Sequence, residues 1–111
     1  MEIATCLKAL GDPTRFRIFQ ALLERKHCVR SLSKQLGVSE SAISQHMKVL
    51  KEAGLVYGER FGYHIHYFPR QETLDALAAA FQHMQQQSQR LDRDTRICQC
   101  EFRRQHYEQT P

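Results

Sequence analysis

Four cysteines are the residues of this 111-residue chain with the most distinctive chemistry. Cys98 and Cys100 form a C-x-C pair, which suits a soft ion bound through two sulfurs. Cys28 lies in the basic stretch RKHCV, and positive neighbours favour the reactive thiolate form. Cys6 instead falls on an apolar helical stripe and is expected to be a buried structural residue. Cys28, Cys98 and Cys100 are therefore the candidate ligands for a thiophilic metal or metalloid ion.

Those thiols are expected to be reduced. The start of the chain, MEIATCLKALGDP, lacks the basic and apolar regions of a secretion signal, and no apolar run is long enough to cross a membrane. We therefore expect a cytoplasmic protein with no membrane partner, where disulfides are rare.

The charge of the chain is concentrated in its middle third. Residues 25–60 contain seven basic and three acidic side chains, whereas the rest of the chain contains nine of each. A confined positive excess indicates an anionic partner that docks on this segment. A solvated charged face is the alternative on charge alone.

Hydrophobic periodicity predicts a mainly helical (α+β) fold. We expect helices over residues 2–10, 13–24, 31–36, 40–53 and 71–91. Two runs rich in β-branched and aromatic residues, LVYGER and YHIHYF, predict a β-hairpin with a positive φ at Gly62. We place a folded domain at residues 1–92 and a C-terminal tail at residues 93–111.

The apolar stripes of the first two helices predict which side chains face the core. In the first helix the stripe is Ile3, Cys6, Leu7 and Leu10. In the second helix it consists of Phe16, Phe19, Leu22 and Leu23, widened by Ile18. Gly11 is expected to end the first helix in a left-handed conformation, and Asp12 and Pro13 to begin the second.

The order of these elements predicts a winged helix-turn-helix. Two helices joined by the tight turn LGVS, followed at once by a hairpin, place the second helix of the pair at a DNA major groove. Gln45 can read adenine, and Lys48 can read guanine or a phosphate. For His46, partly buried packing is the alternative to DNA contact. The candidate DNA-binding residues are Ser39, Ser41, Ser44, Gln45, His46, Lys48, Lys51 and Arg60.

The hairpin has two further features. Its tip carries Arg60 and Phe61, so it either contacts the DNA backbone or minor groove or merely covers the core. His64 and His66 are two residues apart and share one face of a strand, a spacing that suits a metal. Polar residues on a solvated strand face are the commoner explanation.

The predicted terminal helix carries an apolar stripe too long to bury in so small a domain. A two-fold symmetric homodimer, in which this helix and the first helix pack across the axis, would cover it. Packing within one chain is the alternative. The candidate dimer residues are Ile3, Leu7, Leu74, Leu77, Ala78, Phe81 and Met84.

The segments LKALGDPTRFRIFQALL, VRSLSKQLGVSESAISQHMKVLKEAGLVYGER and GYHIHY resemble the ArsR/SmtB family of winged-helix repressors over about residues 4–81. The resemblance implies a homodimer released from operator DNA by an inducer, often a metal ion or arsenite. The chain departs from the family at two sensing sites. The thiol pair C-V-C reads Cys28-Val29-Arg30 here, and the zinc and nickel pattern Asp-x-His is broken after Asp75.

The predicted function is a DNA-binding repressor whose inducer is arsenite or a soft divalent metal ion. A repressor switched by thiol oxidation or persulfide without metal is one alternative. A winged-helix protein-interaction module that does not read DNA is another. We find no catalytic triad, phosphate-binding loop or pair of carboxylates in the sequence, so we do not expect an enzyme.

Overall fold

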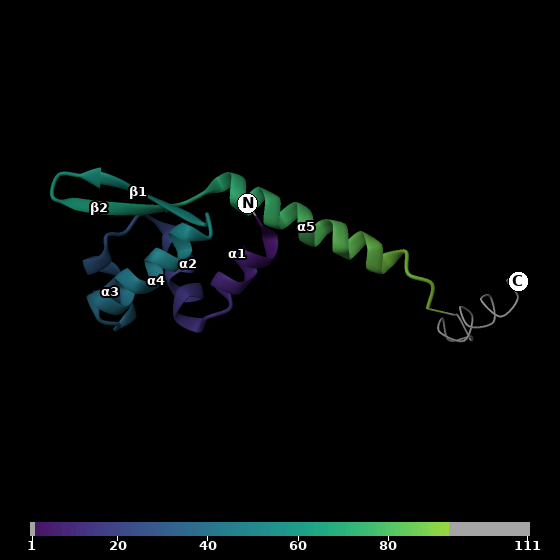
Figure 1. Cartoon of the computed structure of the whole chain (residues 1–111), viewed down its shortest axis with the longest axis horizontal. Coiled ribbons are helices and arrows are strands. Elements are labelled where there is room, and N and C mark those ends of the chain that lie inside the picture. Colours follow the sequence, from purple (N-terminus) through teal and green to yellow (C-terminus); the bar gives the residue numbers. More distant parts are fainter. Residues whose placement is uncertain (1, 94–111) are drawn as a thin grey trace, which may run out of the picture. The chain divides into compact units, whose positions relative to one another are not determined.

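The computed structural model describes residues 2–93 and confirms the mainly helical winged helix-turn-helix architecture (Figure 1). The chain divides into two compact units after Phe81, and the first unit holds the core. The elements in order are α1 (Ile3–Leu10), α2 (Pro13–Glu24), α3 (Val29–Leu36), α4 (Glu40–Glu52), β1 (Val56–Phe61), β2 (His64–Pro69) and α5 (Gln71–Gln89).

Most of the helix boundaries follow from the predicted start and stop residues. Asp12 caps α2 because its Oδ2 accepts a hydrogen bond from the Arg15 N–H at 3.0 Å. Gly37 ends α3 in the left-handed region at φ 68°. The prediction for Gly11 was wrong: its φ is −74°, and its N–H bonds Lys8 O in a tight turn that leads straight into the next cap.

The start of α3 also differs from the prediction. It begins at Val29 rather than at residue 31. The reason is that Cys28 acts as the N-cap, with its Sγ accepting from the Ser31 N–H at 3.4 Å and its carbonyl accepting from the Leu32 N–H at 3.1 Å. Cysteine is not among the residues preferred at helix N-caps, so the sequence pattern did not predict this boundary.

The core is one apolar cluster to which each helix contributes. On α2, the predicted stripe was partly wrong, because Phe16 and Leu23 are 46% and 52% exposed. Ile18, Phe19 and Leu22 are buried as predicted, and Ala21 joins them. On α1, Cys6 is buried as predicted, but Leu7 is 39% exposed and Ala9, which was not predicted, faces inward. The fully buried side chains are Cys6, Ile18, Leu32, Ile43, Met47, Leu50, Leu55 and Val56.

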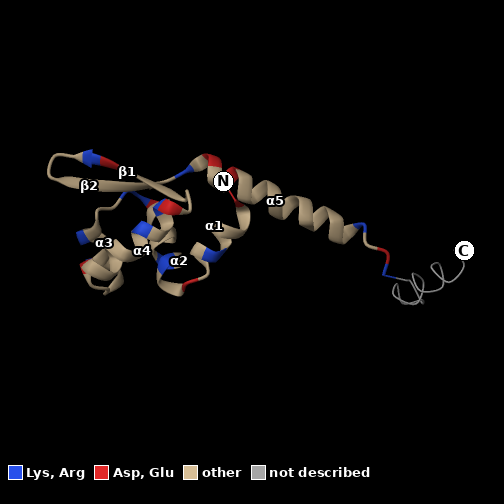
Figure 2. Ribbon diagram, in the orientation of Figure 1, with Lys and Arg blue, Asp and Glu red and all other residues tan. Residues whose placement is uncertain are grey.

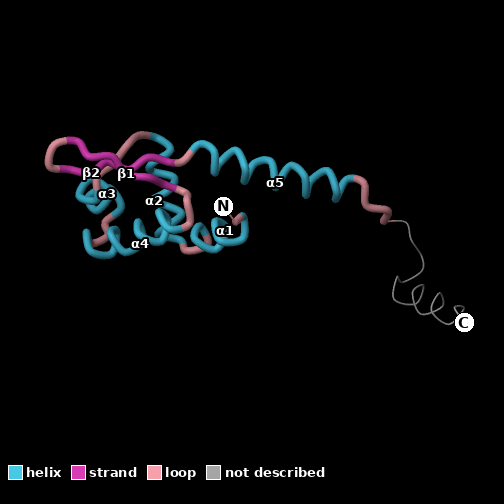
Figure 3. Tube along the Cα trace, turned by 45° about the horizontal axis from the view of Figure 1, so that its top comes forward, coloured by secondary structure: helices cyan, strands magenta, loops and turns pink. Residues whose placement is uncertain are grey.

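The two strands form an antiparallel hairpin along one side of the helices α2–α4 (Figures 1 and 3). Gly62 turns the chain at φ 64°, as predicted. The α2–α3 link, residues 25–28, forms an isolated β-bridge with β2, in which the Tyr67 N–H donates to His27 O at 2.8 Å. The hairpin is therefore fastened to the chain segment that leads into α3.

None of the helices described between residues 2 and 93 is long and apolar enough to span a bilayer.

Candidate nucleic-acid interface and thiol cavity

Helix α4 has two faces of opposite character. Ile43, Met47 and Leu50 are at most 1% exposed and fix the helix against the core. The opposite side is open to solvent and carries Ser41, Ser44, Gln45, Lys48 and Lys51. This polar, basic face has the donors and acceptors that base edges and phosphates pair with.

The N-terminus of α4 is formed by the predicted cap. The Ser39 Oγ accepts from the Ala42 N–H at 3.2 Å and lies 3.4 Å from the Ser41 hydroxyl. The cap is exposed, so the first turn of α4 is both ordered and accessible. A helix N-terminus of this kind attracts anionic groups.

Two lysines border a groove between α4 and the hairpin. A hollow of about 320 Å³ is lined by Ser44, Lys48, Lys51 and Tyr67, with Met47 and Glu52 completing its walls. Figure 2 shows basic positions on α3, on α4 and near the tip of β1. Ser44, Lys48 and Lys51 are thus brought together on the side of α4 that faces the wing.

His46 is half-buried and contacts the N-terminal end of α2. Its Nδ1 accepts from the Arg15 guanidinium at 3.4 Å and lies 3.9 Å from Asp12 Oδ2. The backbone N–H of Arg15 holds the pKa of Asp12 below its usual value. These contacts favour the packing interpretation of His46 over direct DNA contact.

The wing tip is only partly free. Arg60 is exposed. Phe61 stacks on His66 with ring centres 4.8 Å apart, and the Lys26 Nζ lies 4.3 Å from the centre of the Phe61 ring. Such a cation–π contact fastens the tip of the wing to the α2–α3 link.

His64 and His66 share one face of β2, as predicted from their spacing. Within residues 2–93, however, no three histidine, cysteine or acidic side chains come together in a way that would hold a metal ion. Two imidazoles alone do not complete a metal site.

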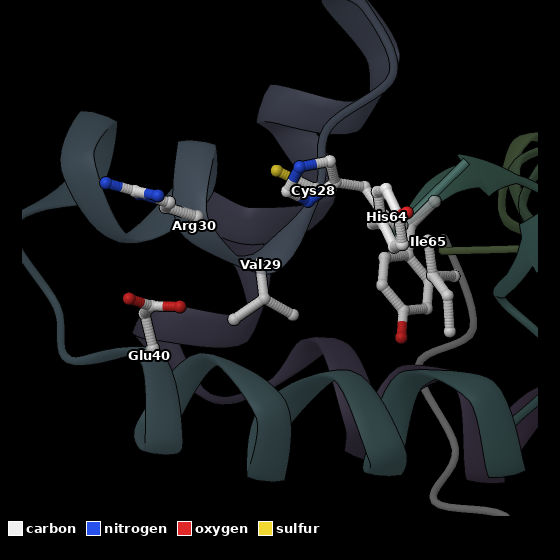
Figure 4. A pocket seen from close by; sticks show the side chains of 8 residues that line it. Cys28, Val29, Arg30, Glu40, His64 and Ile65 are labelled. Carbon is white, nitrogen blue, oxygen red and sulfur yellow. The ribbon is translucent and has the colours of Figure 1, made fainter. Parts of the chain in front are cut away.

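Cys28 opens onto a cavity of about 490 Å³ between the start of α3, the start of α4 and the hairpin (Figure 4). Burial raises the pKa of its thiol, but hydrogen bonds from Ser31 and the Arg30 N–H outweigh this, and the net pKa lies below the usual value. The lining residues are Cys28, Val29, Arg30, Glu40, Tyr63, His64, Ile65 and Tyr67.

His27, next to this thiol, is 3% exposed. The Ser31 hydroxyl donates to Cys28 O at 3.1 Å, so it accepts from His27 Nδ1 at 2.9 Å. Burial first, and the nearby Arg25 second, lower the pKa of His27. This buried histidine was not predicted, because the link shows no hydrophobic periodicity.

The other thiols fall into two groups. Cys6 is fully buried, as expected, and its thiol donates to Ala53 O at 3.3 Å. Cys98 and Cys100 lie outside the described residues.

The candidate dimer residues differ in exposure. Phe81 and Met84 on α5 are 52% and 45% exposed, and Leu7 on α1 is 39% exposed. Ala78 is also exposed, and Ile3 and Leu74 are half-buried. Leu77 is 7% exposed and belongs to the core of its own chain, so it has little surface left for a partner.

Comparisons with known proteins agree with this architecture. Residues 12–57 match the family model of the bacterial regulatory proteins of the arsR family. The HTH-type transcriptional repressor SmtB of Mycobacterium tuberculosis is 44% identical over 61 residues, which are 55% of this chain and 45% of that protein. The chain spans about half the length of these curated relatives.

Two solved structures extend the similarity. An ArsR-like transcriptional regulator from Rhodococcus sp. RHA1 superposes with a TM-score of 0.72 at 30% identity, covering 79% of this chain and 83% of that one. A possible transcriptional regulator for arsenical resistance gives a TM-score of 0.63 at 37% identity, covering 70% and 81%. From the matched helix-turn-helix, the shared fold and these identities, we conclude that the chain belongs to the ArsR family of bacterial winged helix-turn-helix transcriptional regulators.

Proposed function

We propose that this chain is a homodimeric transcriptional repressor that binds operator DNA through α4 and the wing and is released by a thiol-binding inducer. The observation that carries the proposal is the division of α4 into a buried apolar stripe and an exposed face with Ser41, Gln45 and Lys48. A helix seated in this way presents its polar face to a partner without disturbing the core.

The chemistry of that face favours DNA over a protein partner. Its groups are hydroxyls, an amide and ammonium groups, whereas protein interfaces are centred on aromatic and aliphatic residues. Lys48 and Lys51 border the same groove as the Tyr67 side chain of the wing. Two cations on one wall suit the phosphates of a duplex.

A homodimer is supported by apolar side chains that the chain itself leaves uncovered. Leu7, Phe81 and Met84 are each more than a third exposed. A two-fold interface that covered them would also present two copies of α4 to successive major grooves.

For the inducer, we favour arsenite held by thiolates of Cys28, Cys98 and Cys100, since three sulfurs suit its trigonal coordination. The half-buried Cys28 has a lowered pKa, which favours the thiolate that such a bond requires. The similarity to a possible regulator for arsenical resistance points the same way. A redox or persulfide reaction of the same thiols is the second candidate, because a lowered thiol pKa favours that chemistry too.

DNA binding is tested first. A preferred duplex is selected from a random library with the full-length protein, and binding is then measured by fluorescence anisotropy. Gln45→Ala should reduce the preference for the selected duplex over random duplex, because one bidentate base contact gives about 1–3 kcal/mol of discrimination. Equal losses on both duplexes would show that Gln45 does not read bases.

The inducer is tested on that complex with arsenite, cadmium, zinc, an oxidant and a persulfide donor. Release by arsenite of the wild type, but not of Cys98→Ser/Cys100→Ser protein, is the expected result. Release by the oxidant or the persulfide donor, while arsenite, cadmium and zinc all fail, would favour the redox candidate. A triple serine variant with an unchanged response would show that the thiols are structural.

A further inference from the structure

The α2–α3 link joins the thiol to the wing more directly than to α4. On one side of Cys28, its Sγ and carbonyl start α3 through Ser31 and Leu32. On the other side, His27 O holds the Tyr67 amide of β2 at 2.8 Å, and Lys26 lies over Phe61 at the wing tip. A displacement at residue 28 therefore reaches the hairpin through adjacent residues.

The cavity at Cys28 is built from both sides of this junction. One wall comes from the start of α3, and the other from Tyr63, His64, Ile65 and Tyr67 at the turn and in β2. Figure 4 shows the charged groups of Arg30 and Glu40 on one side, Val29 and Cys28 in the middle, and the imidazole of His64 directed toward Cys28 from the other side. About 490 Å³ is within the range of small-molecule sites, and the lining combines the apolar Val29 and Ile65 with polar and charged groups.

Two side chains of the hairpin wall pack against the neighbouring strand β1. Ile65 and Tyr67 already lie against the bare backbone of Gly58, where a Cβ atom would come within 2.8 Å of Ile65 Cγ2 and 3.1 Å of a Tyr67 ring carbon. Tyr63 is fully exposed and Ile65 is 42% exposed, so the packed part of this wall lies at the half-buried Tyr67. A group bound beside Tyr67 is therefore expected to displace the strand that carries it.

We propose that this cavity is an effector site for small organic electrophiles with an activated carbon–carbon double bond, and that their addition to Cys28 weakens DNA binding by displacing the wing. The thiolate sulfur attacks the β-carbon, a sulfur–carbon bond forms and the π bond breaks. The α-carbon takes up a proton equivalent to the one that the thiol released. The inference rests on the proposed DNA-binding function and names a route for its regulation.

N-Ethylmaleimide serves as the probe. The full chain carries Cys98→Ser and Cys100→Ser, and Cys6 is fully buried, so mass spectrometry should find a single adduct, on Cys28. Cys28→Ser in the same background is the matched control, because a serine hydroxyl keeps the cap of α3 without the reactivity. The affinity for the selected duplex and the amide hydrogen exchange are measured with and without the adduct.

An effect through the wing and an effect through the recognition helix α4 predict faster hydrogen exchange at different amides. If the wing moves, the Tyr67 amide, which is bonded to His27 O, should exchange at least tenfold faster, and the Ile43 amide, which is bonded to Ser39 O in α4, should not change. Faster exchange at Ile43 alone would overturn the proposal, since it would place the effect in the recognition helix. Unchanged exchange at both amides would overturn it as well.

DNA binding gives the second readout. The adduct should weaken binding at least tenfold, and in Arg60→Ala protein, where the cation of the wing is already removed, by less than threefold. An equal loss in both backgrounds would contradict action through the wing. If the unmodified protein binds no duplex, the proposed function fails, and the exchange at Tyr67 still decides whether the adduct moves the wing.

Discussion

Helix α4 and the α2–α3 link are specified by the sequence in different ways. In α4, residues four and seven apart are buried, and the intervening residues are left for a partner. In the link, one backbone hydrogen bond to Tyr67 and one cation–π contact with Phe61 set the structure. The comparison shows a functional helix placed by local periodicity beside a candidate regulatory junction placed by contacts distant in the sequence.

The largest effect should come from removing a side chain of the buried stripe. Ile43→Ala is expected to lower the free energy of unfolding by about 2–5 kcal/mol, because Ile43 is fully buried and the cavity left behind adds to the lost transfer energy. The neighbouring exposed Ser44→Ala should stay within about 0.5 kcal/mol. Urea unfolding measures both, and similar losses would show that the two faces of α4 are not distinct.

The next effect concerns the wing. Gly58→Ala places a methyl group against Ile65 and Tyr67 and should cost about 1–3 kcal/mol of stability by overpacking. Glu59→Ala, one residue along the same strand and exposed, is the control. Equal thermal stability of the two variants would mean that Ile65 and Tyr67 can shift to accommodate the added methyl group.

These two regions also show how much of the structure could be predicted from the sequence alone. The caps at Asp12 and Ser39 and the glycine turns at Gly37 and Gly62 were predicted because each depends on a few neighbouring residues. The exposure of Phe16 and Leu23 was not, because a helical stripe indicates a face but not how wide a neighbour covers it.

The thiol site was predicted only in part. Cys28 stood out as a reactive thiol, but its role as the α3 cap and the cavity beside it depend on the pairing of His27 with Tyr67. That pairing joins residues 40 positions apart through backbone groups, and side-chain patterns carry no trace of it. The need for glycine at position 58 arises from the same cross-strand packing and was likewise missed.

A smaller loss is expected at the start of α4. Ser39→Ala removes the hydroxyl that accepts from the Ala42 N–H and should cost about 1 kcal/mol. Ser39→Asn, which keeps a capping oxygen, should retain most of the stability. If thermal melting ranks the asparagine variant no higher than the alanine variant, the cap contributes nothing.

Acidification should affect the link through His27. Its pKa in the folded state lies below the usual value of 6.5, so the unfolded chain binds the proton more tightly. The contribution of neutral His27 to the free energy of unfolding is therefore fully present above pH 6.5 and is lost as the pH falls below that value. The urea midpoint of the wild type should drop more between pH 7.5 and pH 5.5 than that of His27→Gln, and equal drops would assign the effect to other groups.

The most direct test of the central claim is the salt dependence of binding to the selected duplex by the wild type and by Lys48→Ala. We predict that the logarithm of the affinity falls steeply and linearly with the logarithm of salt concentration. The slope for Lys48→Ala should be smaller in magnitude by about one, because a phosphate contact is lost from the exposed face of α4. Binding that is insensitive to salt, or identical slopes for the two proteins, would contradict the assignment of this face to DNA.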